Sequence, residues 1–120
     1  MDASATIAAL GALAQEHRLA AFRLLVVAGG EGLSAGAIAD RLGLAASSLS
    51  FHLAALSHAG LIAQRRQGRS IIYTANYAAM NALVGYLTEN CCGGAPCHDA
   101  PVCCPQDIAQ AEFMTGEDAA

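Results

Sequence analysis

A chain of 120 residues has room for one ordinary domain and little more, and its 55% hydrophobic content excludes an intrinsically disordered protein. The 28 alanines, against six aromatic residues, favour a mainly α-helical fold with a core of small side chains. No run of roughly 20 apolar residues predicts a membrane span. The first residues lack the basic start of a signal peptide, so we expect a cytoplasmic protein with no membrane partner.

Charge and cysteine divide the chain at the same point. Residues 1–90 hold all six arginines, five acidic residues and no cysteine, a net charge of +1. Residues 91–120 hold five acidic residues, no arginine or lysine, and all five cysteines, a net charge of −5. We therefore predict a folded domain over 1–90 and a cysteine-rich acidic tail over 91–120. The acidic total disfavours indiscriminate nucleic-acid binding but allows binding through a local arginine cluster.

Apolar residues at three- and four-residue spacing predict five helices, over residues 4–14, 16–28, 34–42, 46–58 and 77–90. The first helix has an apolar stripe at Ile7, Leu10 and Leu13. The fifth has a longer one, at Tyr77, Met80, Leu83, Val84 and Leu87. Three prolines argue against a continuous helix in the tail and leave only a short helix near 106–114.

The third and fourth helices have the spacing of a helix-turn-helix. Ser34 is the expected N-cap of the third helix, and Gly43 begins a tight turn before the fourth. The fourth helix turns Leu49, Leu53 and Leu56 inward, and its small polar face suits the major groove of DNA. The candidate DNA-reading residues on that helix are Ser47, Ser48, Ser50, Phe51 and His52. Serine hydroxyls can bind base edges or phosphates.

Two of those residues have alternative interpretations. Phe51 either packs on a thymine methyl or lies under a neighbouring loop. His52 lies between Leu49 and Leu56 on the helical wheel, so a histidine at the core boundary fits as well as a DNA contact.

Residues 61–66 and 70–74 flank a glycine-containing tip at 67–69, which predicts a two-stranded hairpin, or wing. Half of the arginines lie there, and guanidinium groups suit phosphates and narrow minor grooves. The candidate wing contacts are Arg65, Arg66, Gln67, Gly68 and Arg69; a solvated hairpin tip is the alternative. Together these elements predict a mainly α, winged helix-turn-helix protein that binds double-stranded operator DNA.

Several stretches resemble the ArsR/SmtB family of metal-responsive repressors. They are Leu49-Ser50-Phe51-His52-Leu53-Ala54-Ala55-Leu56, Ala59-Gly60-Leu61-Ile62 and Arg66-Gln67-Gly68-Arg69-Ser70-Ile71-Ile72-Tyr73. Gln15-Glu16-His17-Arg18-Leu19 is similar to the start of the family's second helix. The resemblance covers roughly residues 4–90.

This resemblance implies a winged-helix homodimer that associates through the first and fifth helices. It also implies that Ser47, Ser50 and Phe51 meet bases or phosphates, and that Arg66 and Gly68 belong to the wing.

The family's metal sites have no counterpart within residues 1–90. Alanines stand where an arsenic-binding Cys-x-Cys pair would lie, and the fifth helix has Glu89 but no histidine for a zinc site. The run from Thr88 to Gly94, followed by Cys97, resembles instead the ArsR subgroup with a C-terminal three-thiolate arsenite site.

The chemistry of these thiols also favours trivalent arsenic, because soft ligands select soft centres. Cys91 and Cys92 can supply two sulfurs, Gly93 and Gly94 let the chain turn back, and Cys97 can supply the third. Thiols near a helix C-terminus stay protonated, which zinc tolerates less well. We expect one arsenite, antimonite or methylarsenite per subunit as inducer, no organic cofactor, and an accessory role for Cys103 and Cys104.

Other interpretations remain open at this stage. Zinc or cadmium held by four cysteines, or by cysteines and His98, is the main rival, although paired Cys-Cys doublets fit zinc spacing poorly. A thiol redox or sulfur-species sensor on the same scaffold is another, and a reactive tail without a ligand is a third. An enzyme is disfavoured, since no flavin-binding fingerprint is present and the chain is too short for such a domain.

Overall fold

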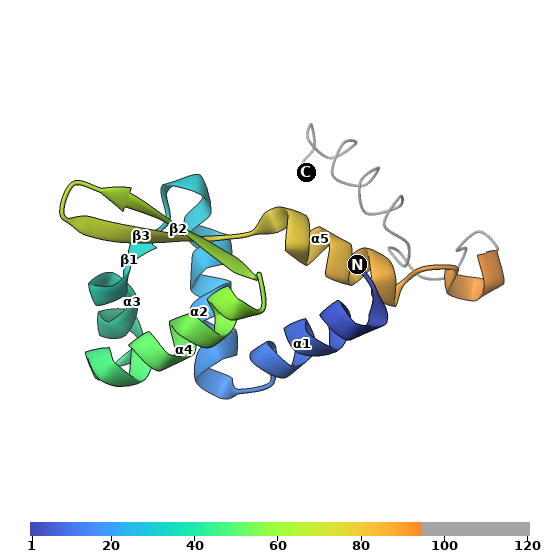
Figure 1. Cartoon of the computed structure of the whole chain (residues 1–120), viewed down its shortest axis with the longest axis horizontal. Helices are drawn as coiled ribbons and strands as arrows, with labels where there is room; N and C mark the ends of the chain where they lie inside the picture. The colour runs from blue at the N-terminus through green and yellow to red at the C-terminus, as the bar shows by residue number, and fades with distance from the viewer. Residues whose placement is uncertain (95–120) are drawn as a thin grey trace, which may run out of the picture. The chain divides into compact units, whose positions relative to one another are not determined.

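The structure is a computed structural model that describes residues 1–94. Residues 1–80 form one compact unit, and a second unit begins at Asn81. The elements in chain order are α1 (Ala3–Leu13), α2 (Glu16–Ala28), η1 (Gly29–Glu31), β1 (Leu33–Ser34), α3 (Ala35–Leu42), α4 (Ala46–His58), β2 (Ile62–Gln67), β3 (Ser70–Ala75), α5 (Tyr77–Leu87) and η2 (Cys91–Gly94). Figure 1 shows the β2–β3 hairpin projecting from the helices of the first unit. The winged helix-turn-helix prediction is confirmed.

Helices α1, α2, α3 and α5 each begin after a polar side chain that caps them, within one residue of the predicted start. The Ser34 hydroxyl accepts a hydrogen bond from the Ala37 amide at 3.2 Å and starts α3, as expected. Asn76 starts α5 in the same way, through the Ala79 amide at 3.1 Å. Gly43 adopts the left-handed conformation that ends α3, and the Leu44 amide then bonds to the Ala39 carbonyl at 3.1 Å.

The core of the first unit lies where α4 meets α2 and α3. Its largest fully buried side chains are Leu25, Ile38, Leu49, Leu56 and Leu61. Each buried leucine or isoleucine contributes about 1.5–3 kcal/mol relative to an exposed one. Alanines share this core, with Ala9 and Ala21 fully buried. The expected core of small side chains is therefore present.

The apolar stripe predicted for α1 does not face this core. Ile7 is 69% exposed and Leu10 is 42% exposed, whereas Thr6, Ala9 and Ala12 are buried. Buried Thr6 is satisfied because its hydroxyl donates to the Asp2 carbonyl at 2.8 Å. Ile7 and Leu10 thus remain on the outer side of α1, whereas Leu13 is half-buried.

The sheet has three strands where the sequence predicts two. Short β1 pairs antiparallel with β3, placing Leu33 opposite Tyr73 and Ser34 opposite Ile72, so the order is β1-β3-β2. Two residues are too few for an alternating pattern, which explains why β1 escapes detection. The turn before β1 depends on Gly32, whose φ is +68° and whose missing side chain lets it lie against the Tyr73 carbonyl.

The fifth helix is shorter than predicted. It ends at Leu87, and the Thr88 hydroxyl donates to the Val84 carbonyl at 2.8 Å in its last turn. Asn90 then takes a φ of +58°, a left-handed conformation that asparagine tolerates and that a helix cannot continue through. Of the predicted stripe only Leu83 is buried, while Val84 and Leu87 are exposed.

Two expectations fall in residues 95–120, outside the part that the structure describes: the short helix near 106–114, and the sites at Cys97, Cys103 and Cys104. Among the helices of residues 1–94, none is both long enough and apolar enough to span a bilayer.

We predict that Gly32→Ala lowers the free energy of unfolding by at least about 2 kcal/mol, because it adds backbone strain and a clash with β3. Urea unfolding at fixed protein concentration measures this. Gly30→Ala is the matched control, since a Cβ there meets nothing within 4 Å. Equal stability of the two variants would contradict the prediction.

Candidate nucleic-acid interface

Helix α4 is amphipathic in the way a DNA-reading helix requires. Leu49, Leu53 and Leu56 are buried against the core. Ser47, Ser48 and Ser50 are exposed. The first turn of α4 contains no acidic residue, and no side chain caps it. Its amide groups and serine hydroxyls therefore form a surface of hydrogen-bond donors without negative charge, which suits a phosphate backbone.

Phe51 is 70% exposed on the outer side of α4. Of the two interpretations of this residue, cover by a neighbouring loop does not occur within residues 1–94. Its ring contacts the His52 ring edge-on, with 6.2 Å between centroids. Phe51 is thus available to a ligand of α4.

His52 is a boundary residue held by α2. The Arg18 Nε donates a hydrogen bond to His52 Nδ1 at 3.4 Å, and the His17 ring lies 5.7 Å away, centroid to centroid. Partial burial, and then the charges of Arg18 and His17, lower the pKa of His52 below its ordinary value of 6.5. Neutral His52 can accept at Nδ1, which places its proton on Nε2.

The two adjacent arginines of β2 have different surroundings. Arg65 Nη1 donates to the Gly30 carbonyl at 3.0 Å, and its Nη2 donates to the Glu31 carbonyl at 3.1 Å and to Gln67 Oε1 at 3.4 Å. Arg65 therefore anchors the wing to η1.

Arg66 lies on the opposite face of the hairpin. It pairs with Ile71, and Gln64 on the same face pairs with Tyr73. Tyr73 lines a hollow of about 220 Å³ with Leu49 and Ser50 of α4, among others, so this face is turned toward the helix-turn-helix.

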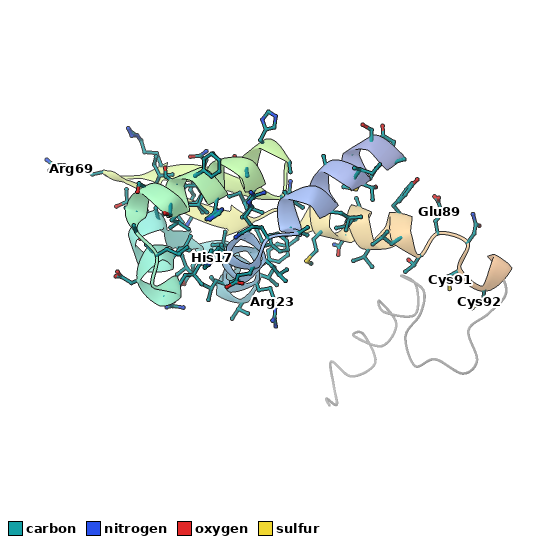
Figure 2. All side chains as sticks on the ribbon, turned by 90° about the horizontal axis from the view of Figure 1, so that it is seen from below. His17, Arg23, Arg69, Glu89, Cys91 and Cys92 are labelled. Atoms are coloured by element: carbon teal, nitrogen blue, oxygen red, sulfur yellow. The ribbon has the colours of Figure 1, made fainter. Side chains whose placement is uncertain are left out.

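The wing tip carries the remaining predicted contacts. Gly68 has a φ of +64°, which the two-residue turn between β2 and β3 requires. Figure 2 shows Arg69 at the far end of the hairpin, pointing away from the helices of this unit. Within residues 1–94, the structure gives the guanidinium groups of Arg66 and Arg69 no hydrogen-bond partner. Both guanidinium groups can therefore reach phosphates.

The predicted metal ligands are described only in part. Cys91 and Cys92 lie on the turn after α5, on the same side of it in Figure 2, and their sulfurs are 3.9 Å apart. Two thiolates on one tetrahedral ion with bonds of about 2.3 Å are separated by about 3.8 Å. Hydrogen bonding with Cys91 raises the pKa of the Cys92 thiol. Within residues 1–94, no three histidine, cysteine or acidic residues are grouped as a metal site.

Sequence reasoning missed the roles of Arg18 and Arg65. The run containing Arg18 indicates only a family resemblance, and a contact between residues 18 and 52 has no local signal. For Arg65 a signal exists: in a strand of period 2, only one of two adjacent arginines can face the helix-turn-helix.

Comparison with known proteins gives a consistent result. Residues 13–65 match the family described as "Helix-turn-helix domain". The transcriptional regulator YgaV of Escherichia coli K12 is 35% identical over 92 residues, which cover 77% of this chain and 93% of YgaV.

Two solved structures extend the comparison. An ArsR-like transcriptional regulator from Rhodococcus sp. RHA1 has the same fold, with a TM-score of 0.66, 23% identity and 92% of each chain covered. The homodimeric winged helix-turn-helix DNA-binding domain of Mb0332 from Mycobacterium bovis has a TM-score of 0.57 and 28% identity, with 79% of this chain and 88% of that chain covered. Mb0332 is described as a possible ArsR-family transcriptional regulator.

We predict that Arg66→Ala and Arg65→Ala have different effects. Arg66→Ala should weaken DNA binding and reduce the slope of log affinity against log salt by about one per subunit, with stability unchanged. Arg65→Ala should cost about 1 kcal/mol of stability, because the wing loses its anchor on η1. Fluorescence anisotropy at several salt concentrations and urea unfolding measure the two effects. Indistinguishable variants would contradict this assignment.

We predict that His52 makes stability depend on pH below 6.5. The unfolded chain binds a proton at His52 near pH 6.5, whereas the folded chain does so only at its lowered pKa. Stability therefore falls as pH decreases from 6.5 to the folded-state pKa, and His52 contributes no dependence above or below that window. Urea unfolding at pH 7.5, 6.5 and 5.5, in steps chosen around 6.5, should show a shallower dependence for His52→Gln. The same slope in both proteins would contradict the prediction.

Proposed function

Because this chain belongs to the ArsR family of winged helix-turn-helix transcriptional regulators, we propose that it is a homodimeric repressor released from operator DNA by trivalent arsenic. The inducer binds the thiols of Cys91, Cys92 and Cys97. One observation carries a shared thiol site: the sulfurs of Cys91 and Cys92 lie 3.9 Å apart after α5, close enough for one centre to bind both. The choice of arsenic among such centres follows from thiol chemistry, because soft ligands select soft centres.

DNA binding rests on α4 and the wing. The exposed serines of α4 and the unbonded guanidinium groups of Arg66 and Arg69 supply donors to a polyanion. The arginines of the wing give this surface a positive charge, although the chain as a whole has a net charge of −4. DNA binding therefore depends on this local surface. The recognition helices of a dimer then bind half-sites about 34–36 Å apart.

The homodimer is supported by two apolar surfaces. On α1, Ile7 and Leu10 are exposed; on α5, Val84 and Leu87 are exposed, Leu87 by 57%. Apolar side chains repeated along one helix face in this way are typical of surfaces that bind a second protein. We assign both helices to contacts between subunits.

The protonation state of the Cys92 thiol favours arsenic over zinc. The raised pKa of Cys92 keeps this thiol protonated near neutral pH. Arsenous acid exchanges its three hydroxyls for three thiols, forming three As–S bonds and releasing three waters, so no net proton leaves. Zinc requires thiolates, and each thiol must then lose its proton.

The effect on DNA need not be large in energy. A coupling of about 1–3 kcal/mol between two sites is typical, and switching from mostly bound to mostly free needs the upper end or more. Ligands on the chain that follows α5 act next to the proposed dimer contact. A shift in half-site separation is therefore the simplest way for them to lower DNA affinity.

A thiol redox switch is the second candidate, because the same close sulfur pair can be oxidised together with the other tail cysteines. Zinc or cadmium binding is the third, and the 3.9 Å spacing also suits such ions. Both keep the same DNA surface and differ only in what the thiols recognise.

The test is fluorescence anisotropy of the reduced protein on its own promoter DNA. We expect release near one arsenite per subunit, with little effect of zinc or cadmium. Cys91→Ser, Cys92→Ser and Cys97→Ser should each abolish release while leaving DNA binding intact. The matched control, Cys103→Ser with Cys104→Ser, should respond normally. If arsenite does not affect DNA binding but a mild oxidant abolishes it reversibly, the arsenic proposal is contradicted and the redox switch is favoured.

A further inference from the structure

The first unit contains an open groove whose lining residues have no part in the proposed inducer site. It has a volume of about 510 Å³, within the range of small-molecule sites. Helices α1, α2 and α4 and the start of the following turn border it. Its lining residues are Ala8, Ala12, Arg18, Phe51, Ala54, Ala55, His58 and Ala59.

The lining has two chemical parts. Five alanine methyl groups and the ring of Phe51, which is 70% exposed, form an apolar surface. Flat apolar molecules fit a surface of this kind, because short alanine side chains allow close approach and an aromatic ring offers offset stacking. Arg18 and His58 are the only other members of the lining, and none of the lining residues is acidic.

Arg18 is held in place at the groove. Its Nε donates to His52 Nδ1 at 3.4 Å, so one of its three nitrogens is used to orient the side chain. Neutral His52 can play this part because burial lowers its pKa. The structure gives the two η nitrogens no hydrogen bond within residues 1–94. A guanidinium group in this state is suited to a bidentate contact with a carboxylate.

We propose that this groove is a second ligand site, which binds a small aromatic carboxylate. The ring lies on the alanines beside Phe51, and the carboxylate pairs with Arg18. The observation that selects this class is the combination of an apolar surface with one oriented cation and no acidic residue. Since Phe51 belongs to the helix that reads DNA, such a ligand gives the regulator an input separate from its thiols. This proposal does not rest on arsenic binding.

The test uses the full-length reduced protein with its alanine methyl groups isotopically labelled, titrated with naphthoate and followed by NMR. We expect saturable shifts of the Ala8, Ala54, Ala55 and Ala59 methyls, with a dissociation constant on the order of 1 mM or tighter. Ala37 and Ala63, which do not line the groove, should not shift. Naphthalenemethanol, the neutral analogue, should bind at least about tenfold more weakly, because it cannot form the charge-assisted pair with Arg18.

Two substitutions test the two parts of the site. Arg18→Gln should weaken naphthoate binding at least about tenfold, whereas Arg23→Gln, on the same helix but outside the groove (labelled in Figure 2), should not. Ala54→Leu should block the groove without disturbing the core, since Ala54 is exposed. Cys91→Ser should bind naphthoate normally, so that failure of the arsenic proposal leaves this one testable.

Several results would overturn the proposal. They are absence of saturable shifts, equal binding of the neutral analogue, and binding that survives both Arg18→Gln and Ala54→Leu. A change of oligomeric state caused by Ala54→Leu, measured by sedimentation, would assign the groove to a contact between copies of the chain instead.

Discussion

Leu49, Leu53 and Leu56 bury one side of α4 against α2 and α3, and this burial decides which residues α4 presents to solvent. Three buried leucines supply about 5–9 kcal/mol of transfer free energy, comparable to the net stability of a small domain. The helix therefore cannot rotate about its axis without losing its core. Its serines, Phe51 and the edge of His52 have fixed directions as a result, and a DNA-reading surface requires such directions.

The wing depends on a second constraint, the attachment of a hairpin to the end of α2. Arg65 binds two carbonyls of η1, and Gly32 lets the chain lie against β3. The Arg65 guanidinium thus forms its hydrogen bonds within the protein, whereas those of Arg66 and Arg69 can bind an external anion. In a chain with so few basic residues, this division limits DNA binding to a small surface and makes it sensitive to salt.

The two proposed ligand sites have opposite chemistry and separate locations along the chain. The thiols after α5 suit a soft metalloid that forms a neutral complex with them. The groove between α1, α2 and α4 suits an organic anion with a flat apolar body. Arg18 connects the groove to His52, and hence to the DNA-reading helix, through one hydrogen bond. Under these two proposals, a metalloid acts on the regulator through the proposed dimer contact, and an organic anion acts through the helix α4.

The five helices, the helix-turn-helix and the hairpin could be predicted from the sequence, apart from the end of α5, because each has a local signal: apolar spacing, a capping residue or a glycine. Ser34, Gly43 and Gly68 act where the sequence predicts, since their effects reach only a few residues. Composition alone also separated the cysteines of the tail from the arginines of the domain. Cys91 and Cys92 are adjacent in the sequence, but the distance of 3.9 Å between their sulfurs comes from the structure.

Contacts between candidate residues that are distant in the sequence could be seen only in the folded structure. Arg18 meets His52 across 34 positions, and Arg65 meets Gly30 across 35, so no local pattern encodes either pair. The two-residue strand β1 exists only because β3 lies beside it. The outward direction of Ile7 and Leu10 has the same origin, because α1 buries Thr6 and alanines against its neighbours instead. Contacts between distant residues depend on the packing of the whole unit. The apolar periodicity of a single helix therefore cannot predict them.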